Sequence, residues 1–376
     1  MIAASFILGY KLAGKKENLT PVIIGGDFDT QDAKIFWKTW DYIKNNYADP
    51  SKIDHHRASF EAARGLLKSL NDPYSDLMTQ EEGKIFEEDL SGSFGGVGIE
   101  IGMRNGMITV ISPLEGTPAY QAGIKAGDII VSINGTSTEN MSLEKAVSLI
   151  RGPEGTKVKL GIMREGWKEP KDFELIRAKI EVPVVKYEFI QPNIGYIKLN
   201  TFIATTLAKF SEAMVNLSNQ GAERFIIDLR NNPGGYLEVA IRLGELFVPR
   251  GKIIVIQQSR DEHRVFRSEG PGLLSNAKMV ILVNKGSASA SEIFAAALRD
   301  NLGVKLIGEK TFGKGTVQQM FNVEGNLLKL TVAYWLTPKN IKIEGTGLTP
   351  DIIIKDNSES NKDPIKEKAI EYLKNI

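Results

Sequence analysis

The expected fold is decided by residues 278–318, which read KMVILVNKGSASASEIFAAALRDNLGVKLIGEKTFGKGTVQ. An apolar, β-branched run at 279–283 ends at Asn284-Lys285-Gly286, and an alanine-rich pattern with helical spacing follows. Three serines lie between the two patterns: Ser287, Ser289 and Ser291. The stretch therefore predicts a strand, a tight turn of small residues and the N-terminus of a helix.

Such a turn is suited to presenting a nucleophile. The first N–H groups of a helix lack intrahelical partners and carry the positive end of its dipole, so they can hold a developing oxyanion. Lys314 lies between two glycines, 25 residues after Ser289. We interpret Ser289 as a nucleophile and Lys314 as its base. The local pattern leaves the alternative open that Ser289 is only an N-cap and Lys314 only a solvated lysine.

The composition narrows the choice of chemistry. The chain has three histidines, His55, His56 and His263, and none lies near a turn rich in glycine and serine. A Ser-His-Asp arrangement and a histidine-rich metal site are therefore disfavoured, and a lysine is the remaining conventional base. There is no cysteine, which excludes disulfides and thiol catalysis. The net charge of +1 gives no electrostatic case for nucleic acid, and we expect neither metal nor cofactor.

A second glycine turn precedes the serine turn. Strand patterns at 194–199, 225–229, 253–257 and 280–283 alternate with helical patterns at 205–217 and 236–247, which predicts an α/β layer with largely parallel strands. The turn Asn232-Pro233-Gly234-Gly235 ends one strand and opens a helix, as the serine turn does. If both turns lie at one edge of the sheet, the N–H groups of Gly234 and Ala290 form an oxyanion hole.

Residues 94–166 form a β-rich module. It contains the phrase AGIKAGDIIVSINGT at 122–136, a helical pattern and then GPEGTKVKL at 152–160. The module resembles a PDZ domain. The resemblance implies that Gly96, Val97, Gly98 and Ile99 form a loop whose N–H groups face the terminal carboxylate of a peptide, which adds as a strand to the sheet edge. The alternative is a glycine-rich β-turn without a ligand.

Helical patterns dominate the N-terminal part. A helix from Thr30 carries an apolar stripe of Phe36, Trp40, Ile43 and Tyr47. A second helix, 54–70, is expected to bury Phe60, Ala63, Leu67 and Leu70, and a third spans 80–90. We interpret the aromatic stripe as core or subunit interface.

The first fourteen residues are apolar but too short to span a bilayer, and no basic segment precedes them. The segment is either the clipped end of a signal or anchor helix or a disordered terminus. The first interpretation is favoured and places the remainder outside the cytoplasm, in a bacterial periplasm or on the outer face of the cytoplasmic membrane.

Four motifs carry a family resemblance in addition to the PDZ phrases: Asp72-Pro73-Tyr74-Ser75, DLRNNPGG at 228–235, GSASASE at 286–292 and GEKTFGKG at 308–315. Over residues 30–355 the chain resembles the C-terminal processing peptidases, which are tail-specific serine proteases with an embedded PDZ domain. The resemblance implies a crotonase/ClpP-like α/β protease core with an inserted β-rich PDZ domain and an N-terminal helical region. It also implies that Ser289 is the nucleophile, Lys314 the base and Gln318 the residue that orients the lysine.

This division of roles is physically consistent. A lysine with an ordinary pKa of about 10.4 is protonated at neutral pH and cannot accept a proton. Burial of the ammonium group lowers the pKa of a lysine. Gln318 can hydrogen-bond Lys314 without adding a negative charge that would raise its pKa again.

The expected domains are a signal or anchor remnant with an extended lead at 1–28, a helical region at 29–90, the PDZ domain at 91–166, the protease core at 167–355, and a polar linker with a C-terminal helix at 356–376. The resemblance implies an ATP-independent endopeptidase that captures free protein C-termini and cleaves near them. It further implies regulation by a charged PDZ residue, for which Arg151 and Arg164 are candidates, and a homodimer formed through the terminal helices.

Two other functions were weighed. One is a PDZ scaffold whose α/β domain only binds, and the intact Ser289, Lys314 and Gln318 argue against it. The other is an acyl-CoA enzyme on a crotonase-like sheet, which would need a basic cluster for the cofactor phosphates that the sequence lacks.

Overall fold

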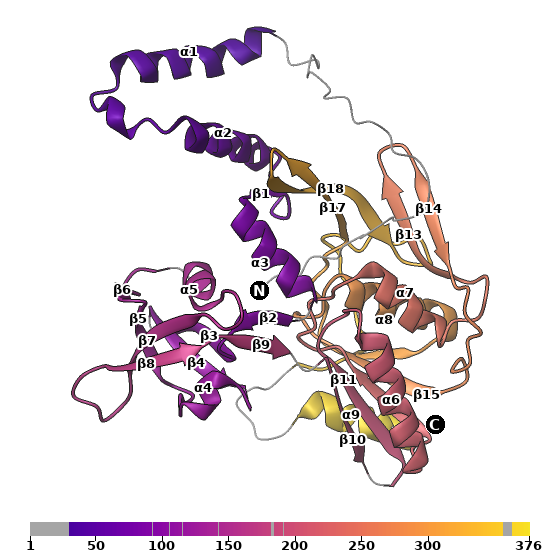
Figure 1. Cartoon of the computed structure of the whole chain (residues 1–376). Coiled ribbons are helices and arrows are strands. Elements are labelled where there is room, and N and C mark those ends of the chain that lie inside the picture. Colours follow the sequence, from indigo (N-terminus) through magenta and orange to yellow (C-terminus); the bar gives the residue numbers. More distant parts are fainter. Residues whose placement is uncertain are drawn as a thin grey trace.

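The computed structural model describes residues 30–91, 93–104, 106–114, 116–141, 143–181, 184–190, 192–355 and 363–376. The segment expected to be a signal or anchor remnant, residues 1–28, lies outside these ranges. Within them, no helix is both long enough and apolar enough to cross a membrane. Figure 1 shows a large core, a smaller β-rich module beside it, and two helices that extend away from both.

The core is built on a six-stranded sheet in the order β10-β11-β12-β15-β16-β19. All neighbours pair in parallel except β10 and β11. The strands are β10 (Val185–Ile190), β11 (Ile194–Leu199), β12 (Arg224–Asp228), β15 (Lys278–Val283), β16 (Lys305–Gly308) and β19 (Ile352–Ile353). The predicted α/β layer with largely parallel strands is confirmed.

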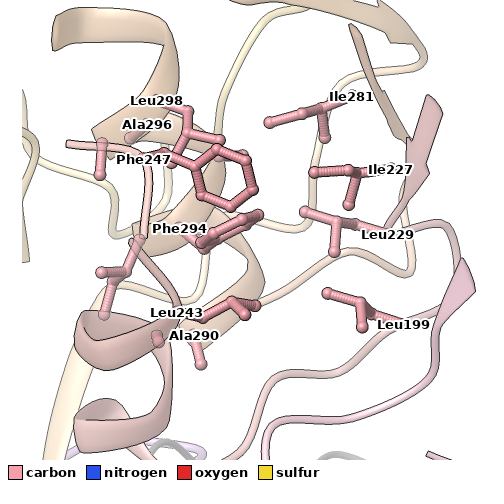
Figure 2. Packing of buried hydrophobic residues seen from close by; sticks show 14 of the residues in the cluster. Leu199, Ile227, Leu229, Leu243, Phe247, Ile281, Ala290, Phe294, Ala296 and Leu298 are labelled. Atoms are coloured by element: carbon pink, nitrogen blue, oxygen red, sulfur yellow. The ribbon is translucent and has the colours of Figure 1, made fainter. Parts of the chain in front are cut away.

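Helices cover both faces of this sheet. Because side chains alternate along a strand, Ile227 and Ile281 pack against α6 (Thr206–Asn219), α7 (Leu237–Glu245) and α8 (Ala290–Leu302) on one face. Figure 2 shows the rings of Phe247 and Phe294 facing Ile227 and Ile281. The opposite face is covered by the C-terminal helix, α9 (Pro364–Lys374). The turn that carries Ser289 thus follows a strand, β15, of a sheet that is covered on both faces.

A second sheet is antiparallel and follows the order β1-β18-β13-β14, with β17 also paired to β18. Its strands are β1 (Asp76–Met78), β13 (Ile253–Ser259), β14 (His263–Arg267), β17 (Thr316–Val323) and β18 (Asn326–Leu336). The expectation that residues 253–257 join the parallel layer is wrong. β13 turns directly into β14, and so short a connection permits only antiparallel pairing.

The β-rich module has its own sheet and its own core. The sheet contains β3 (Ile99–Arg104), β4 (Met107–Pro113), β5 (Ile129–Ile133), β6 (Thr136–Ser137), β7 (Lys157–Met163) and β8 (Lys171–Ile176). Two helices complete it, α4 (Pro118–Gln121) and α5 (Leu143–Ile150). β8 follows the boundary expected at residue 166 and forms an edge of this sheet. A ribbon of β2 (Ser93–Gly96) and β9 (Ala178–Glu181) carries the chain into and out of the module.

The N-terminal helices are α1 (Thr30–Asn46), α2 (His55–Ser69) and α3 (Gln80–Ser91). α1 and α2 extend away from the core, whereas α3 runs from the antiparallel sheet toward β2 (Figure 1). The expected burial of one face of α2 is only partial: Phe60, Ala63 and Leu67 are half-buried, whereas Leu70 is 58% exposed. Phe36 and Tyr47 of the α1 stripe are also exposed, since neither helix lies on a core that could cover it. The stripe is therefore not part of the core of this chain.

Candidate active site

Ser289 is the N-cap of α8, at the end of β15. Its backbone has φ 60° and ψ −118°, an unfavourable conformation for a residue with a Cβ. Ser287 Oγ donates to Leu229 O over 2.7 Å and Ser291 Oγ donates to Asn232 O over 2.9 Å. Ser289 Oγ is buried and has no hydrogen-bond partner among the residues that the structure describes. Two serines thus fix the turn, and the hydroxyl of the third is available for chemistry.

Lys314 lies in the turn before β17 and is 1% exposed. Burial lowers the pKa of Lys314 from 10.5 to about 7, and the positive charge of Lys329 acts in the same direction, against Glu344, Asp72 and Glu292. Its Nζ lies 5.0 Å from the centre of the Tyr74 ring. A lysine with this pKa is neutral in about half of the molecules at pH 7, and the neutral form can accept a proton as a general base must.

Glu292 connects the serine turn to the lysine turn. Its Oε2 accepts the N–H groups of Ser289 and Lys314, each over 2.9 Å. Its Oε1 accepts the N–H group of Gly313 over 2.8 Å and the hydroxyl of Thr311. Burial raises the pKa of Glu292, while these hydrogen bonds oppose the rise. One buried carboxylate therefore fixes the distance between the two segments.

Glu292 is a site residue that the sequence did not predict. The signal was present, because a serine at the N-cap with a glutamate three residues later is the capping-box pattern. That pattern predicts the bond to the Ser289 N–H group. It does not predict the bonds to the turn near residue 313, which depend on the tertiary fold.

Residues 72–75 lie beside Lys314, with which Tyr74 is in contact. Their motif contributed to the family resemblance but was given no role. Ser75 Oγ donates to Asp72 and accepts the N–H group of Thr331 on β18 over 2.9 Å. This bond holds the segment against the antiparallel sheet and presents the Tyr74 ring to Lys314. The N-terminal region thereby becomes part of the site.

Gln318 lies on β17 and is fully buried. Its Nε2 donates to Thr316 Oγ1 over 2.7 Å and to Thr331 Oγ1 over 3.2 Å. Its Oε1 accepts no hydrogen bond in the described part of the chain. The expected hydrogen bond from Gln318 to Lys314 is therefore not formed, because the two threonine hydroxyls direct the amide along the strands.

The glycine turn and the serine turn meet as expected. A Cβ on Gly234 would lie 2.8 Å from Ala288 O and 2.9 Å from Ala290 N, so only glycine fits at this contact. Of the two N–H groups predicted to form an oxyanion hole, that of Gly234 already has an acceptor, because it donates to Asn232 Oδ1 over 2.9 Å. This side-chain bond satisfies a buried donor that would otherwise be unpaired. The Ala290 N–H group is at the first position of α8, where no intrahelical acceptor exists.

Comparison with known proteins places the chain in a family. A family model described as Peptidase family S41 matches residues 193–354, and a PDZ domain model matches residues 86–163. The carboxy-terminal processing protease CtpA of Bacillus subtilis (strain 168) is 41% identical over 317 residues, which cover 84% of this chain and 67% of the relative. A probable CtpA-like serine protease of Staphylococcus haemolyticus (strain JCSC1435) is 35% identical over 353 residues, or 93% of this chain and 68% of that relative.

The chain belongs to the S41 peptidase family. Among solved structures, the photosystem II D1 C-terminal processing protease matches with a TM-score of 0.56 and 28% identity, covering 87% of this chain and 94% of that one. The resemblance drawn from the motifs is confirmed, as is the expected combination of an α/β protease core with a PDZ domain. The chain spans 61% to 68% of the length of the Bacillus and Staphylococcus relatives.

In this S41 peptidase the PDZ loop is fixed through its carbonyl groups. Val97 O accepts the N–H group of Ala119 over 2.9 Å, and Gly98 O accepts that of Leu114 over 2.8 Å. Gly96 pairs with β9 and Ile99 with β4, so the four predicted carboxylate-binding residues span the junction of the ribbon and the module. Carboxylate binding by this loop stays a prediction.

The two arginines proposed as a PDZ switch have different surroundings. Arg164 donates to both carboxylate oxygens of Asp128, over 2.6 and 2.7 Å, and to Gly123 O over 2.8 Å, all within the module. Arg151 is 8% exposed and lies 4.0 Å from the centre of the Phe94 ring on β2. Of the two, Arg151 is the one that contacts the ribbon leading to the S41 core.

Proposed function

We propose that the chain is an ATP-independent serine endopeptidase that captures protein C-termini with its PDZ domain and cleaves near them by a Ser-Lys mechanism. One observation carries this proposal. A buried serine hydroxyl that has no hydrogen-bond partner within the described ranges, at a helix N-terminus, is linked through Glu292 to a buried lysine whose pKa is about 7.

The reaction would proceed in two steps. Ser289 Oγ attacks the scissile carbonyl while neutral Lys314 accepts its proton, and the Ala290 N–H group stabilises the oxyanion. The ammonium of Lys314 then protonates the leaving amine, which leaves an acyl-enzyme. In the second step Lys314 accepts a proton from water, which hydrolyses the ester and regenerates the serine.

Two rearrangements are needed before this reaction. Ser289 Oγ must come within hydrogen-bond distance of Lys314 Nζ, and the Gly234 N–H group must leave Asn232 Oδ1 to join Ala290. Gln318 would complete the site by turning its oxygen toward Lys314. We infer that binding of a polypeptide supplies the free energy for these movements.

Mass spectrometry of the products of an unfolded substrate with an apolar tail tests the proposal. Without nucleotide, the parent protein is expected to cut near the tail, and amidation of the terminal carboxylate is expected to slow cleavage. Ser289→Ala and Lys314→Ala should abolish cutting, whereas Ser287→Ala should retain it if the protein folds. Tight binding of C-terminal peptides without any turnover would favour the PDZ scaffold instead.

We further propose that the chain forms a homodimer through α1 and α2. Their exposed apolar side chains include Ile35, Trp37, Tyr42, Leu66 and Leu70, each at least 58% exposed. Soluble monomers rarely expose so many large apolar groups together, and a second copy of the same helices would cover them. Sedimentation velocity should give a dimer for the parent and a monomer for Trp37→Lys/Tyr42→Lys. A monomeric parent at micromolar concentration would contradict it.

The location is proposed from the apolar segment 1–14 alone. Its sequence suggests membrane attachment with the enzyme on the extracytoplasmic side. Protease accessibility in intact cells compared with lysed cells tests this, and protection in intact spheroplasts would contradict it.

A further inference from the structure

A small apolar cluster lies beside the site and outside the cores of the molecule. Three half-buried residues pack against it: Phe86 on α3, Tyr236 before α7, and Met320 on β17. None of the three belongs to the main core, the PDZ core or the core under α9. The three residues therefore share a cluster that is separate from these three cores.

Two of these three residues lie next to catalytic candidates in the sequence. Tyr236 directly follows the glycine turn that packs on Ser289. Met320 comes two residues after Gln318, so both side chains lie on the same face of β17. Tyr236 thus adjoins the turn that packs on Ser289, and Met320 adjoins Gln318 on the β17–β18 ribbon.

The third residue, Phe86, belongs to α3, which packs along the β17–β18 ribbon. The position of a Cβ on Gly83 would be 3.0 Å from Leu327 Cβ, and one turn later the Phe86 ring lies 5.2 Å from Lys329 Nζ. Lys329 pairs with Met320, and the next pair on that face is Thr331 with Gln318. α3 therefore brings Phe86 to the ribbon position adjoining the catalytic glutamine.

We propose that Tyr236 and Met320 line the subsite for an apolar side chain of the substrate next to the scissile bond, and that Phe86 occupies this subsite in the structure. The proposal rests on the proposed protease function. An aromatic ring and a thioether recognise an apolar side chain, and methionine adapts to different shapes. Because Ser289 and Lys314 are buried, a polypeptide must displace covering groups to reach them, and in this proposal Phe86 is one of those groups.

Competition between substrates tests the assignment. Peptides that differ only in the residue before the mapped cleavage site, alanine or phenylalanine, are mixed in one reaction, so that the ratio of their kcat/KM values is independent of the amount of folded enzyme. Met320→Ala is expected to raise the phenylalanine-to-alanine ratio about tenfold by enlarging the subsite. Phe86→Ala is expected to raise kcat/KM for the phenylalanine peptide more than for the alanine peptide.

Phe321→Ala is the matched control, because Phe321 is the neighbour of Met320 on the other face of β17 and is exposed. Its ratio should equal that of the parent. If Met320→Ala does not fold, Met320→Val keeps an apolar side chain but shortens it, so it should still enlarge the subsite and raise the ratio. Ratios within twofold of the parent for both the Met320 and Phe86 variants would overturn the subsite while leaving the protease intact. A parent that cleaves no peptide would overturn the protease function and the subsite together.

Discussion

At the scale of single residues, the site depends on the burial of Lys314. The sequence supported this residue as a base through the scarcity of histidine and the surrounding glycines. It could not show which groups cover the side chain. In the structure these come from distant segments, with Tyr74 below the ammonium and Lys329 near it.

The pH dependence of cleavage follows from this environment. The neutral form of Lys314 is the base, so kcat/KM should rise with pH through about 7 and level off above it, as a single ionisation. Initial rates from pH 5.5 to 9 with an uncharged peptide measure this rise of kcat/KM with pH. A rise centred near the ordinary value of 10.5 would mean that the lysine is not desolvated during turnover.

Burial of Lys314 should also reduce stability. The folded-state pKa lies below the unfolded value of 10.5, so the unfolded chain binds more protons between about pH 7 and 10.5, and stability rises with pH across that window. Lys314→Met should therefore raise the free energy of unfolding by about 2–4 kcal/mol at pH 7 while removing activity.

Urea denaturation measures this difference. Lys310→Met, at an exposed lysine in the same loop, is the control and should change stability little. The gain from Lys314→Met should disappear as the pH approaches 10.5. A gain that stays constant with pH would show that packing, and not ionisation, causes it.

At the scale of elements, the strand–turn–helix unit of β15 and α8 was predictable because its signals are local. The apolar run, the small residues and the capping pattern all lie within residues 279–292. The meeting of this unit with the glycine turn also followed, because parallel strands end at one edge of a sheet. The state of the individual groups did not follow: the Gly234 N–H bond to Asn232 and the amide orientation of Gln318 depend on neighbours that no local pattern specifies.

Glu292 gives the sharpest prediction at this scale. Glu292→Gln replaces one acceptor oxygen by an NH₂ group that faces backbone donors, so buried N–H groups lose their partners. We expect a loss of about 2–4 kcal/mol in stability and at least a hundredfold loss in kcat.

A purely structural role would lower activity only in proportion to the unfolded fraction. The variant should therefore be assayed where denaturation curves show it fully folded. Normal kcat in that folded variant would contradict the proposed coupling of the two turns. Glu309→Gln, at a carboxylate in the loop after β16, serves as the control.

At the scale of the whole molecule, the combination of an α/β protease core with a PDZ domain was predictable because the motifs of each lie close together in sequence. The positions of α1, α2 and α3 were not. Their apolar stripes predicted burial, yet a stripe does not state whether its partner is the same chain, another copy or a substrate. The contribution of the segment at residues 72–75 to the site likewise required the fold.

The C-terminal helix gives a prediction of overall stability. Arg230 precedes the glycine turn and bonds Asp228 and Asp363, the residue that caps α9. Burial alone would raise the pKa of Asp363, but bonds from Arg230 and the Lys366 N–H group hold it below 3.8. Asp363→Ala should cost about 1–2 kcal/mol at pH 7 through loss of the cap and the ion pair.

Asp363→Asn separates the two contributions, because asparagine caps a helix well but carries no charge. A depressed folded-state pKa stabilises above pH 3.8 and loses this effect as the pH falls through the folded value, so the parent and Asp363→Asn should converge at low pH. Chemical denaturation of the full chain measures both variants. Equal stability of the parent and Asp363→Asn at pH 7 would show that the ion pair between Arg230 and Asp363 does not contribute to stability.

The most direct test of the central claim is the site and rate of reaction with a fluorophosphonate, read by intact mass and peptide mapping. We expect a single adduct on Ser289, a labelling rate that rises with pH through about 7, and near-complete loss of labelling in Lys314→Ala. An adduct on Ser287 or Ser291, or an unchanged rate in Lys314→Ala, would contradict it.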